Sequence, residues 1–157
     1  MDIPFIAIYY LRISTKPDFH EAHNNLGNAL AEEGKFQEAA ARYANALQIK
    51  PDYAEAHNNL GMVLAQQGKT QEAAAHYARA LQAKPDYPEA HNNLGMVLAQ
   101  QGKTQEAAAH YARALQIKPD YVQAHMNLGI ALARQGKAKE AIEHFSGALG
   151  PKRPGAR

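Results

Sequence analysis

A sequence period of 34 residues constrains this chain more than any other feature. A Lys-Pro-Asp-aromatic motif begins at Lys16, Lys50, Lys84 and Lys118. Residues 54–87 and 88–121 differ at only two positions. A repeat of this length is typically one supersecondary unit that cannot cover its own apolar face, so neighbouring units must stack. We therefore expect a linear array of repeats.

Each repeat is predicted to be a pair of α-helices. Alanine supplies 32 of the 157 residues and valine only three, a balance that favours helices over strands. In the second repeat, a helix-compatible run over residues 55–67 ends at Gly68, a residue type that tolerates the left-handed conformation. A second run over residues 70–84 ends before Pro85, which cannot continue a helix. The chain is expected to be all-α.

One face of each predicted helix carries large apolar side chains beside small ones. The small residues let two helices approach closely, and the large ones fill the space between them. Burial of each leucine contributes about 1.5–3 kcal/mol. At helical spacing the expected core positions are His57, Leu60, Gly61 and Leu64 on the first helix, and Ala73, Tyr77, Ala80 and Leu81 on the second.

This pattern resembles the tetratricopeptide repeat: a large residue, Leu-Gly, a small residue, an aromatic, another alanine and a closing proline within 34 residues. The resemblance covers four repeats, at residues 20–53, 54–87, 88–121 and 122–149. It implies a right-handed α-solenoid of stacked helical hairpins, a superhelix whose concave face receives partners. The sequence departs from the family at positions where tryptophan is frequent, which here hold His23, His57, His91 and His125.

The two ends of the chain depart from the repeat. Residues 5–15 register with the second helix of a repeat, so we expect residues 1–19 to hold an unpaired half-repeat helix. Residues 150–157 are predicted to be a basic, disordered tail. Uncapped ends of such arrays expose apolar surface, so a homo-oligomer is expected. The candidate contact with another copy consists of apolar and aromatic side chains, namely Ile6, Ile8, Tyr9, Tyr10 and Leu11.

The face next to the core side of each first helix is rich in amides. Asn25, Asn59, Asn93 and Asn127 recur once per repeat, a ladder similar to that in the repeat region of O-linked N-acetylglucosamine transferases. An asparagine amide both donates and accepts hydrogen bonds, so a ladder of them can pair with the backbone of an extended peptide. The alternative is a merely solvated surface. The candidate peptide-binding residues are Asn24, Asn25, Asn28, Asn58, Asn59, Met62, Gln66, Asn92, Asn93, Met96, Gln100, Asn127 and Arg134.

Charge and motifs argue against other classes of protein. Apart from Lys152, Arg153 and Arg157 the chain has 14 basic and 15 acidic residues, so no nucleic-acid partner is expected. The most apolar stretch, residues 4–11, is too short to cross a bilayer, so we expect a cytoplasmic protein with no membrane partner. The chain has no cysteine and no phosphate-binding or nucleophile motif. We therefore expect no enzyme and no cofactor.

The eight histidines do not predict a metal site, because those on the core face occur one per repeat and lie too far apart to share an ion. Buried neutral histidines are instead expected to make the fold sensitive to acid. The predicted function is a protein-interaction scaffold that binds an extended peptide along the concave face. The alternative is a structural module that assembles through its uncapped ends.

Overall fold

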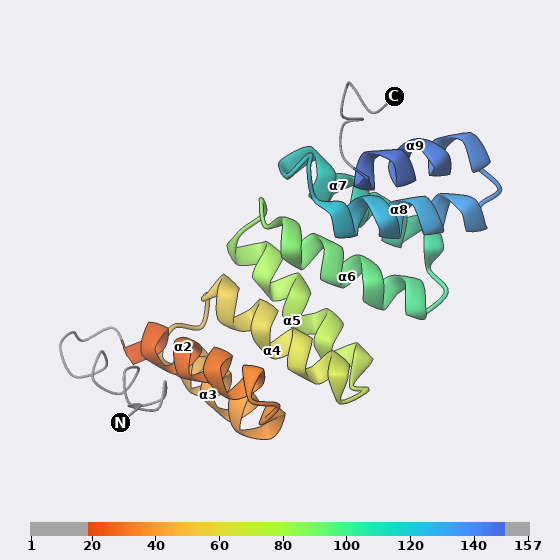
Figure 1. Cartoon of the computed structure of the whole chain (residues 1–157). Helices are drawn as coiled ribbons and strands as arrows, with labels where there is room; N and C mark the ends of the chain where they lie inside the picture. Colours follow the sequence, from red (N-terminus) through yellow and green to blue (C-terminus); the bar gives the residue numbers. More distant parts are fainter. Residues whose placement is uncertain (1–18, 150–157) are drawn as a thin grey trace, which may run out of the picture. The chain divides into compact units, whose positions relative to one another are not determined.

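The computed structural model describes residues 19–149, which form α-helices and contain no strand (Figure 1). The predicted all-α class is therefore confirmed. The expected half-repeat helix with Ile6, Ile8, Tyr9, Tyr10 and Leu11, and the expected tail, lie outside the described residues. The described helices are α2 (Phe19–Glu32), α3 (Phe36–Ile49), α4 (Ala54–Gln66), α5 (Thr70–Ala83), α6 (Pro88–Gln100), α7 (Thr104–Ile117), α8 (Val122–Arg134) and α9 (Ala138–Ala148).

The helices form consecutive hairpins in two compact units. The first unit, Met1–Pro85, contains α2 to α5, and the second, Asp86–Arg157, contains α6 to α9. Within the first unit α2 packs on α3, α3 on α4 and α4 on α5, and α2 also contacts α4. The second unit repeats this scheme with α6 to α9. Each unit is thus a pair of stacked helical hairpins, the arrangement that defines an α-solenoid.

The first helix of each hairpin ends at a glycine, as predicted. Gly68 has φ +76°, and the equivalent glycines of the other three hairpins have φ +77° or +78°. The Gly68 N–H donates to the carbonyl of Ala65 at 3.0 Å, and the Lys69 N–H donates to that of Leu64 at 2.9 Å. These two bonds make a Schellman motif, which stops the helix and turns the chain toward the next one. Observed bounds of α4 and α5 differ by one residue from the predicted runs.

The core of each hairpin is made of leucine, alanine and one aromatic ring. In the second hairpin Leu60, Leu64, Ala73, Tyr77 and Ala80 are all less than 9% exposed, as predicted. The remaining predicted positions are His57 and Gly61, which are buried, and Leu81, which is half-buried.

The aromatic ring packs directly against a glycine of the first helix. A Cβ atom added to Gly61 would lie 2.7 Å from Cε1 of Tyr77, closer than any ordinary contact. The other hairpins share this contact, with 2.5 Å for Gly27 and Tyr43, 2.6 Å for Gly95 and Tyr111, and 2.5 Å for Gly129 and Phe145. Because the buried ring cannot move aside, only glycine fits at this position.

Replacement of Gly61 by alanine should therefore destabilise the fold. Overpacking costs about 1–3 kcal/mol, which outweighs the gain of about 1 kcal/mol in helix propensity. Urea unfolding followed by circular dichroism measures the change. In a Tyr77→Leu background the ring is absent, so the same Gly61→Ala substitution should become neutral or stabilising. Equal destabilisation in both backgrounds would show that the contact does not impose the glycine.

Candidate functional site

The asparagines of the predicted ladder fall into two groups that differ in burial. Asn24, Asn58 and Asn92 are only 4%, 4% and 2% exposed, so their side chains lie inside the stack rather than on its surface. The following residue in each repeat is more accessible: Asn25 is exposed, and Asn59, Asn93 and Asn127 are half-buried.

Two asparagines connect the first helices of successive hairpins. In the first unit the Asn59 Nδ2 donates to Asn24 Oδ1 at 3.1 Å and to Asn28 Oδ1 at 3.0 Å. In the second unit the Asn127 Nδ2 donates to Asn92 Oδ1 at 2.9 Å. These bonds were not predicted, although the bonds from Asn59 to Asn24 and from Asn127 to Asn92 both span one repeat plus one residue. The amides thus hold neighbouring hairpins in register.

These bonds limit what Asn59 can offer to a ligand. An amide nitrogen has two hydrogens, and both are donated inside the stack. The Oδ1 receives only one long contact of 3.4 Å from Asn58 among the described residues. Asn59 is therefore available to a ligand mainly as a hydrogen-bond acceptor.

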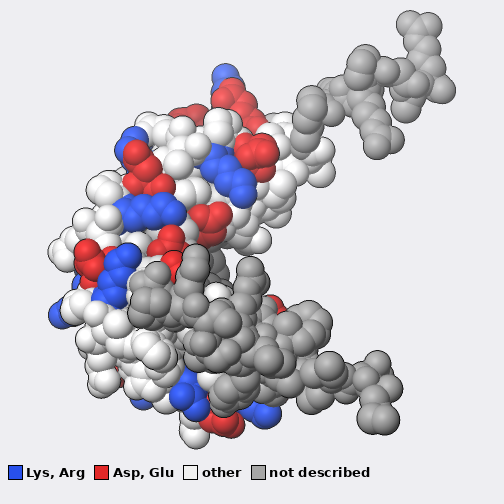
Figure 2. Space-filling model, turned by 90° about the vertical axis from the view of Figure 1, so that its left-hand side faces the viewer, with Lys and Arg blue, Asp and Glu red and all other residues white. Residues whose placement is uncertain are grey.

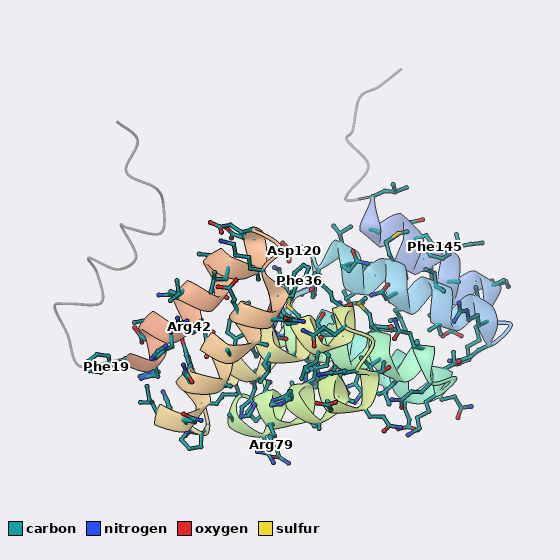
Figure 3. All side chains as sticks on the ribbon, turned by 90° about the horizontal axis from the view of Figure 1, so that it is seen from below. Phe19, Phe36, Arg42, Arg79, Asp120 and Phe145 are labelled. Carbon is teal, nitrogen blue, oxygen red and sulfur yellow. The ribbon has the colours of Figure 1, made fainter. Side chains whose placement is uncertain are left out.

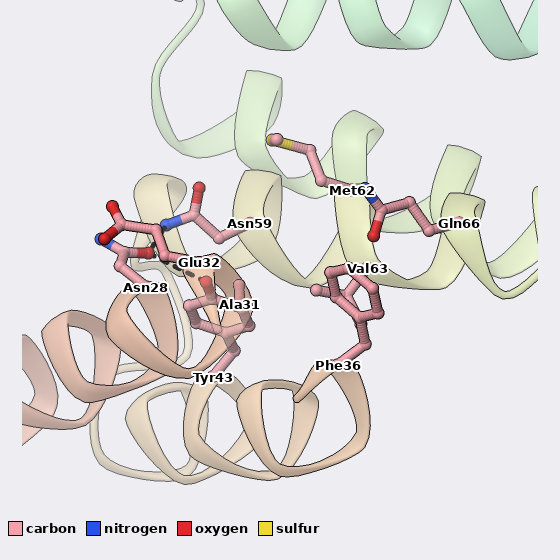
Figure 4. Close-up of a pocket in the computed structure, with 9 residues that line it drawn as sticks. All are labelled: Asn28, Ala31, Glu32, Phe36, Tyr43, Asn59, Met62, Val63 and Gln66. Carbon is pink, nitrogen blue, oxygen red and sulfur yellow. Dashed lines mark hydrogen bonds between the residues drawn. The ribbon is translucent and has the colours of Figure 1, made fainter. Parts of the chain in front are cut away.

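Beside Asn59 the first unit has an open pocket of about 410 Å³ (Figure 4). Asn28, which lines it, accepts a hydrogen bond of 2.9 Å from the Tyr43 hydroxyl. Burial, and secondarily the Glu32 carboxylate, raises the pKa of Tyr43 to about 12, so the phenol stays a neutral donor. The lining consists of Asn28, Ala31 and Glu32 from α2, Phe36 and Tyr43 from α3, and Asn59, Met62, Val63 and Gln66 from α4.

The second unit has a pocket of about 430 Å³ at equivalent repeat positions. The two pockets differ in charge, because the first contains the carboxylate of Glu32 and the second the guanidinium of Arg134. The second pocket is lined by Met96, Ala99, Gln100, Thr104, Tyr111, Asn127, Ile130, Ala131 and Arg134.

The pockets unite most of the predicted peptide-binding residues with others that the prediction omitted. Met62 and Met96, both predicted, are 46% and 41% exposed. The omitted residues are Ala31, Glu32, Val63, Ala99, Ile130 and Ala131 on the first helices, and Phe36, Tyr43, Thr104 and Tyr111 on the second helices. The aromatic ring of Tyr43 and Tyr111 recurs in every repeat and was a signal in the sequence, whereas Glu32, Phe36 and Ile130 do not recur.

The core histidines pair with histidines of the adjacent helix. The Nδ1 atoms of His57 and His76 are 2.9 Å apart, and the equivalent distances are 3.0 Å for His91 and His110 and 3.1 Å for His125 and His144. A constant separation of 19 residues was the signal in the sequence. In the first hairpin Arg42 of α3 stands at the position equivalent to His76 (Figure 3), and its charge helps to lower the pKa of His23 after the larger effect of burial.

The geometry of the His57 and His76 pair fits a hydrogen bond between the two rings. The His57 Nε2 donates to the Pro51 carbonyl at 2.9 Å, so its Nδ1 must accept a bond from the Nδ1–H of His76. The ring centroids are 5.2 Å apart, so the two nitrogens lie close to the line that joins the rings. Zinc–nitrogen bonds of about 2.0–2.1 Å do not fit into that gap. Among the described residues no group of three or more potential ligands could hold a metal.

The histidine pairs should make the stability depend on pH. Burial lowers the pKa of His57 and that of His76. The charges of His57 and Arg79 lower the pKa of His76 further, whereas the Glu72 carboxylate raises it. The pKa values of His23, His110 and His144 are also lowered, chiefly by burial. An unfolded histidine titrates near pH 6.5, so below about that pH the unfolded chain binds more protons than the folded one.

Acid should therefore weaken the fold. We expect thermal melts at pH 5.0 to fall about 5 °C below those at pH 7.5. A variant in which His76, His110 and His144 are all glutamine should show a smaller difference, because each pair loses one titrating ring. Superimposable wild-type melts would contradict this prediction.

Opposite charges alternate on the surface (Figure 2). Lys84 pairs with Glu55 at 3.3 Å and Arg113 with Asp86 at 2.7 Å, whereas Arg79 projects away from α5 (Figure 3). Exposed pairs of this kind contribute at most about 1 kcal/mol each. Within residues 19–149 no helix is long and apolar enough to cross a lipid bilayer.

The stacked hairpins, their glycine stops and their repeated pockets define a helical-repeat protein of the α-solenoid class. The tetratricopeptide repeat family matches residues 10–54, 24–88, 67–122 and 93–157. These matches span most of the sequence, so the chain belongs to the tetratricopeptide repeat family, as the resemblance implied. Membership places it among protein-interaction scaffolds.

Solved structures with the same fold support this assignment. The crystal structure of MamA is similar with a TM-score of 0.78 at 26% identity, over 92% of this chain and 84% of that chain. PilF of Pseudomonas aeruginosa is similar with a TM-score of 0.78 at 27% identity, over 84% of this chain and 60% of that chain. MamA of Desulfovibrio magneticus RS-1, from residue 41 to its end, is similar with a TM-score of 0.76 at 22% identity. The match covers 92% of this chain and 81% of that chain, and it shows the fold alone. A search of curated proteins found no match.

Proposed function

We propose that this protein is an interaction scaffold that binds an extended peptide segment along the face of its first helices, the concave face in arrays of this family. The observation that carries the proposal is the recurrence of one pocket at equivalent positions of both units. A ligand that engages repeated pockets must itself present side chains at regular intervals, as an extended chain does.

The pocket walls suit a peptide of varied sequence. Met62, Met96 and Ile130 are 46%, 41% and 43% exposed. Methionine is flexible and polarizable, so it packs against side chains of different shapes. Asn59 would add specificity for the peptide backbone by accepting an N–H donor at its Oδ1. Binding then combines adaptable apolar contacts with a few fixed hydrogen bonds.

Peptides selected from a random display library on the full chain provide the test. We expect a Met62→Ser/Met96→Ser variant to bind a selected peptide about tenfold more weakly, since it loses apolar contact area in both pockets. Isothermal titration calorimetry measures the affinity. The control is Ala75→Ser/Ala109→Ser, at exposed positions of α5 and α7 outside both pockets, which should leave the affinity unchanged.

Equal loss in both double variants would contradict binding at this face. Asparagine substitutions need a separate control, because Asn59→Ala also removes two bonds between hairpins. Melting temperatures of that variant, measured without peptide, separate lost stability from lost affinity.

A second candidate function is self-assembly, which rests on exposed apolar side chains in α9 and directly after it. Ile142 and Leu149 in the last described hairpin are 64% and 88% exposed. Exposed apolar surface at one end of a helical array can stack against another copy. The residues predicted for the other side of this contact, Ile6 to Leu11, lie outside the described part of the chain.

Light scattering over a range of concentrations tests the assembly. We expect the wild type to form dimers or larger species, and both an Ile142→Glu variant and a chain without residues 1–16 to shift toward monomer. A charged side chain in an apolar contact is costly because it must lose water without gaining a partner. A wild type that stays monomeric at every concentration would refute self-assembly.

A further inference from the structure

The two pockets differ at a position that accepts hydrogen bonds in the first and does not in the second. In the first unit Asn28 Oδ1 accepts from the Tyr43 hydroxyl at 2.9 Å and from Asn59 Nδ2 at 3.0 Å (Figure 4). The equivalent residue of the second unit, two repeats later, is Met96. Its sulfur receives only a long contact of 3.6 Å, from Asn92 Nδ2. The second unit therefore has no oxygen at the place where one oxygen serves two donors in the first.

The hydroxyl of Tyr111 is the first of the two donors affected. Tyr111 is only 3% exposed, and its ring packs on Gly95 as the ring of Tyr43 packs on Gly27. No hydrogen bond joins its hydroxyl to another of the residues 19–149. Among these residues the only fully buried polar side-chain atom without a partner is Gln135 Nε2, so the Tyr111 hydroxyl is open to the pocket that Tyr111 lines.

The side-chain amide of Asn127 supplies the second donor. Its nitrogen has two hydrogens, and one is donated to Asn92 Oδ1 at 2.9 Å. In Asn59 the other hydrogen goes to Asn28, but in Asn127 it has no acceptor within residues 19–149. Asn127 and Tyr111 thus present two donors to the position equivalent to that of Asn28 Oδ1. A buried donor without an acceptor is unfavourable, so an oxygen atom from a ligand would be stabilised there.

The charge of the second pocket favours an acceptor that is negatively charged. Arg134 lines the pocket, and the lining contains no aspartate or glutamate. No ion pair joins Arg134 to another described residue. Burial raises the pKa of Tyr111 to about 12, and the charge of Arg134 acts in the opposite direction. The phenol therefore stays protonated as a donor, and the field of the guanidinium reaches its hydroxyl.

We propose that the pocket of the second unit binds the carboxylate of an aspartate or glutamate side chain from the bound peptide, with Tyr111 and Asn127 donating to one carboxylate oxygen. The inference rests on the proposed peptide-binding function and deepens it. A carboxylate oxygen can accept two hydrogen bonds, as the oxygen of Asn28 does. Bonds to a charged acceptor are also stronger than those to a neutral one.

The pocket of the first unit should not bind acidic side chains. Asn28 already supplies the oxygen that both donors need, and the Glu32 carboxylate in the lining would repel a second negative charge. Recognition of an acidic residue should therefore be confined to the second unit.

The test uses the full chain and two small probes, N-acetyl-glutamate methylamide and its neutral isostere N-acetyl-glutamine methylamide. Nuclear magnetic resonance titrations follow the side-chain amide of Asn127 and the ring signals of Tyr111. We expect the glutamate probe to shift both sets of signals and to bind at least about threefold more tightly than the glutamine probe. This preference should shrink in 1 M salt, which screens charges.

Two variants remove the two donors in different ways. Met96→Asn places an amide oxygen where Asn28 has one, so it should satisfy both donors internally and weaken binding of the glutamate probe at least about threefold. Tyr111→Phe keeps the ring on Gly95 and removes one donor, so it should also weaken binding. Thermal melts of both variants without probe establish that they are folded.

The matched control is Met126→Asn. Met126 is an exposed methionine of α8 that does not line the pocket, so this substitution should leave binding unchanged. Arg134→Gln should reduce the preference for glutamate over glutamine, because it removes the positive charge of the pocket.

Equal binding of the two probes to the wild type, equal binding to the wild type and Met96→Asn, or shifts confined to the first unit would each overturn the inference. The outcome is separable from that of the proposed function. Library-selected peptides that bind this face with no enrichment of aspartate or glutamate would leave the scaffold function intact and remove only the acidic-residue site.

Discussion

The contact between a glycine and an aromatic ring sets the distance between the two helices of every hairpin. Tyr77 occupies the space that a side chain at Gly61 would need, and the same contact recurs in the other three hairpins. The close approach brings α4 near enough to α5 for the rings of His57 and His76 to form a hydrogen bond. Stacking then follows, because the outer faces of one hairpin are covered only by the next.

Asparagines within the first unit form hydrogen bonds with side chains of other helices, and this determines what remains for a ligand. Asn24 is buried and accepts from Asn59, while Asn28 accepts from both Asn59 and Tyr43. These bonds align successive hairpins more specifically than leucine packing alone does. The groups left at the surface include the methionines, the acceptor oxygen of Asn59 and the carboxylate of Glu32.

The sequence predicted the parts of the structure that depend on local spacing. The helix stop at Gly68 and the buried positions of Leu60 and Tyr77 follow from helical periodicity and from the conformational freedom of glycine. The asparagine bridges, the histidine pairs and the pockets were not predicted, because each joins side chains of different helices. Helical periodicity gives the face of one helix, but the partner of His57 or Asn59 depends on how the next helix is rotated against it.

Asn59 donates both of its amide hydrogens within the stack, and this limits which peptide backbones can bind across its side chain. An acceptor oxygen recognises N–H groups and ignores carbonyls, so only half of each peptide unit is read at this point. Proline has no N–H to give, and a proline opposite Asn59 would leave that oxygen with only the long contact of 3.4 Å from Asn58. A peptide that binds this face should therefore lack proline at the residue opposite Asn59 and tolerate proline elsewhere. This one requirement would align the peptide along a surface that otherwise accepts many sequences.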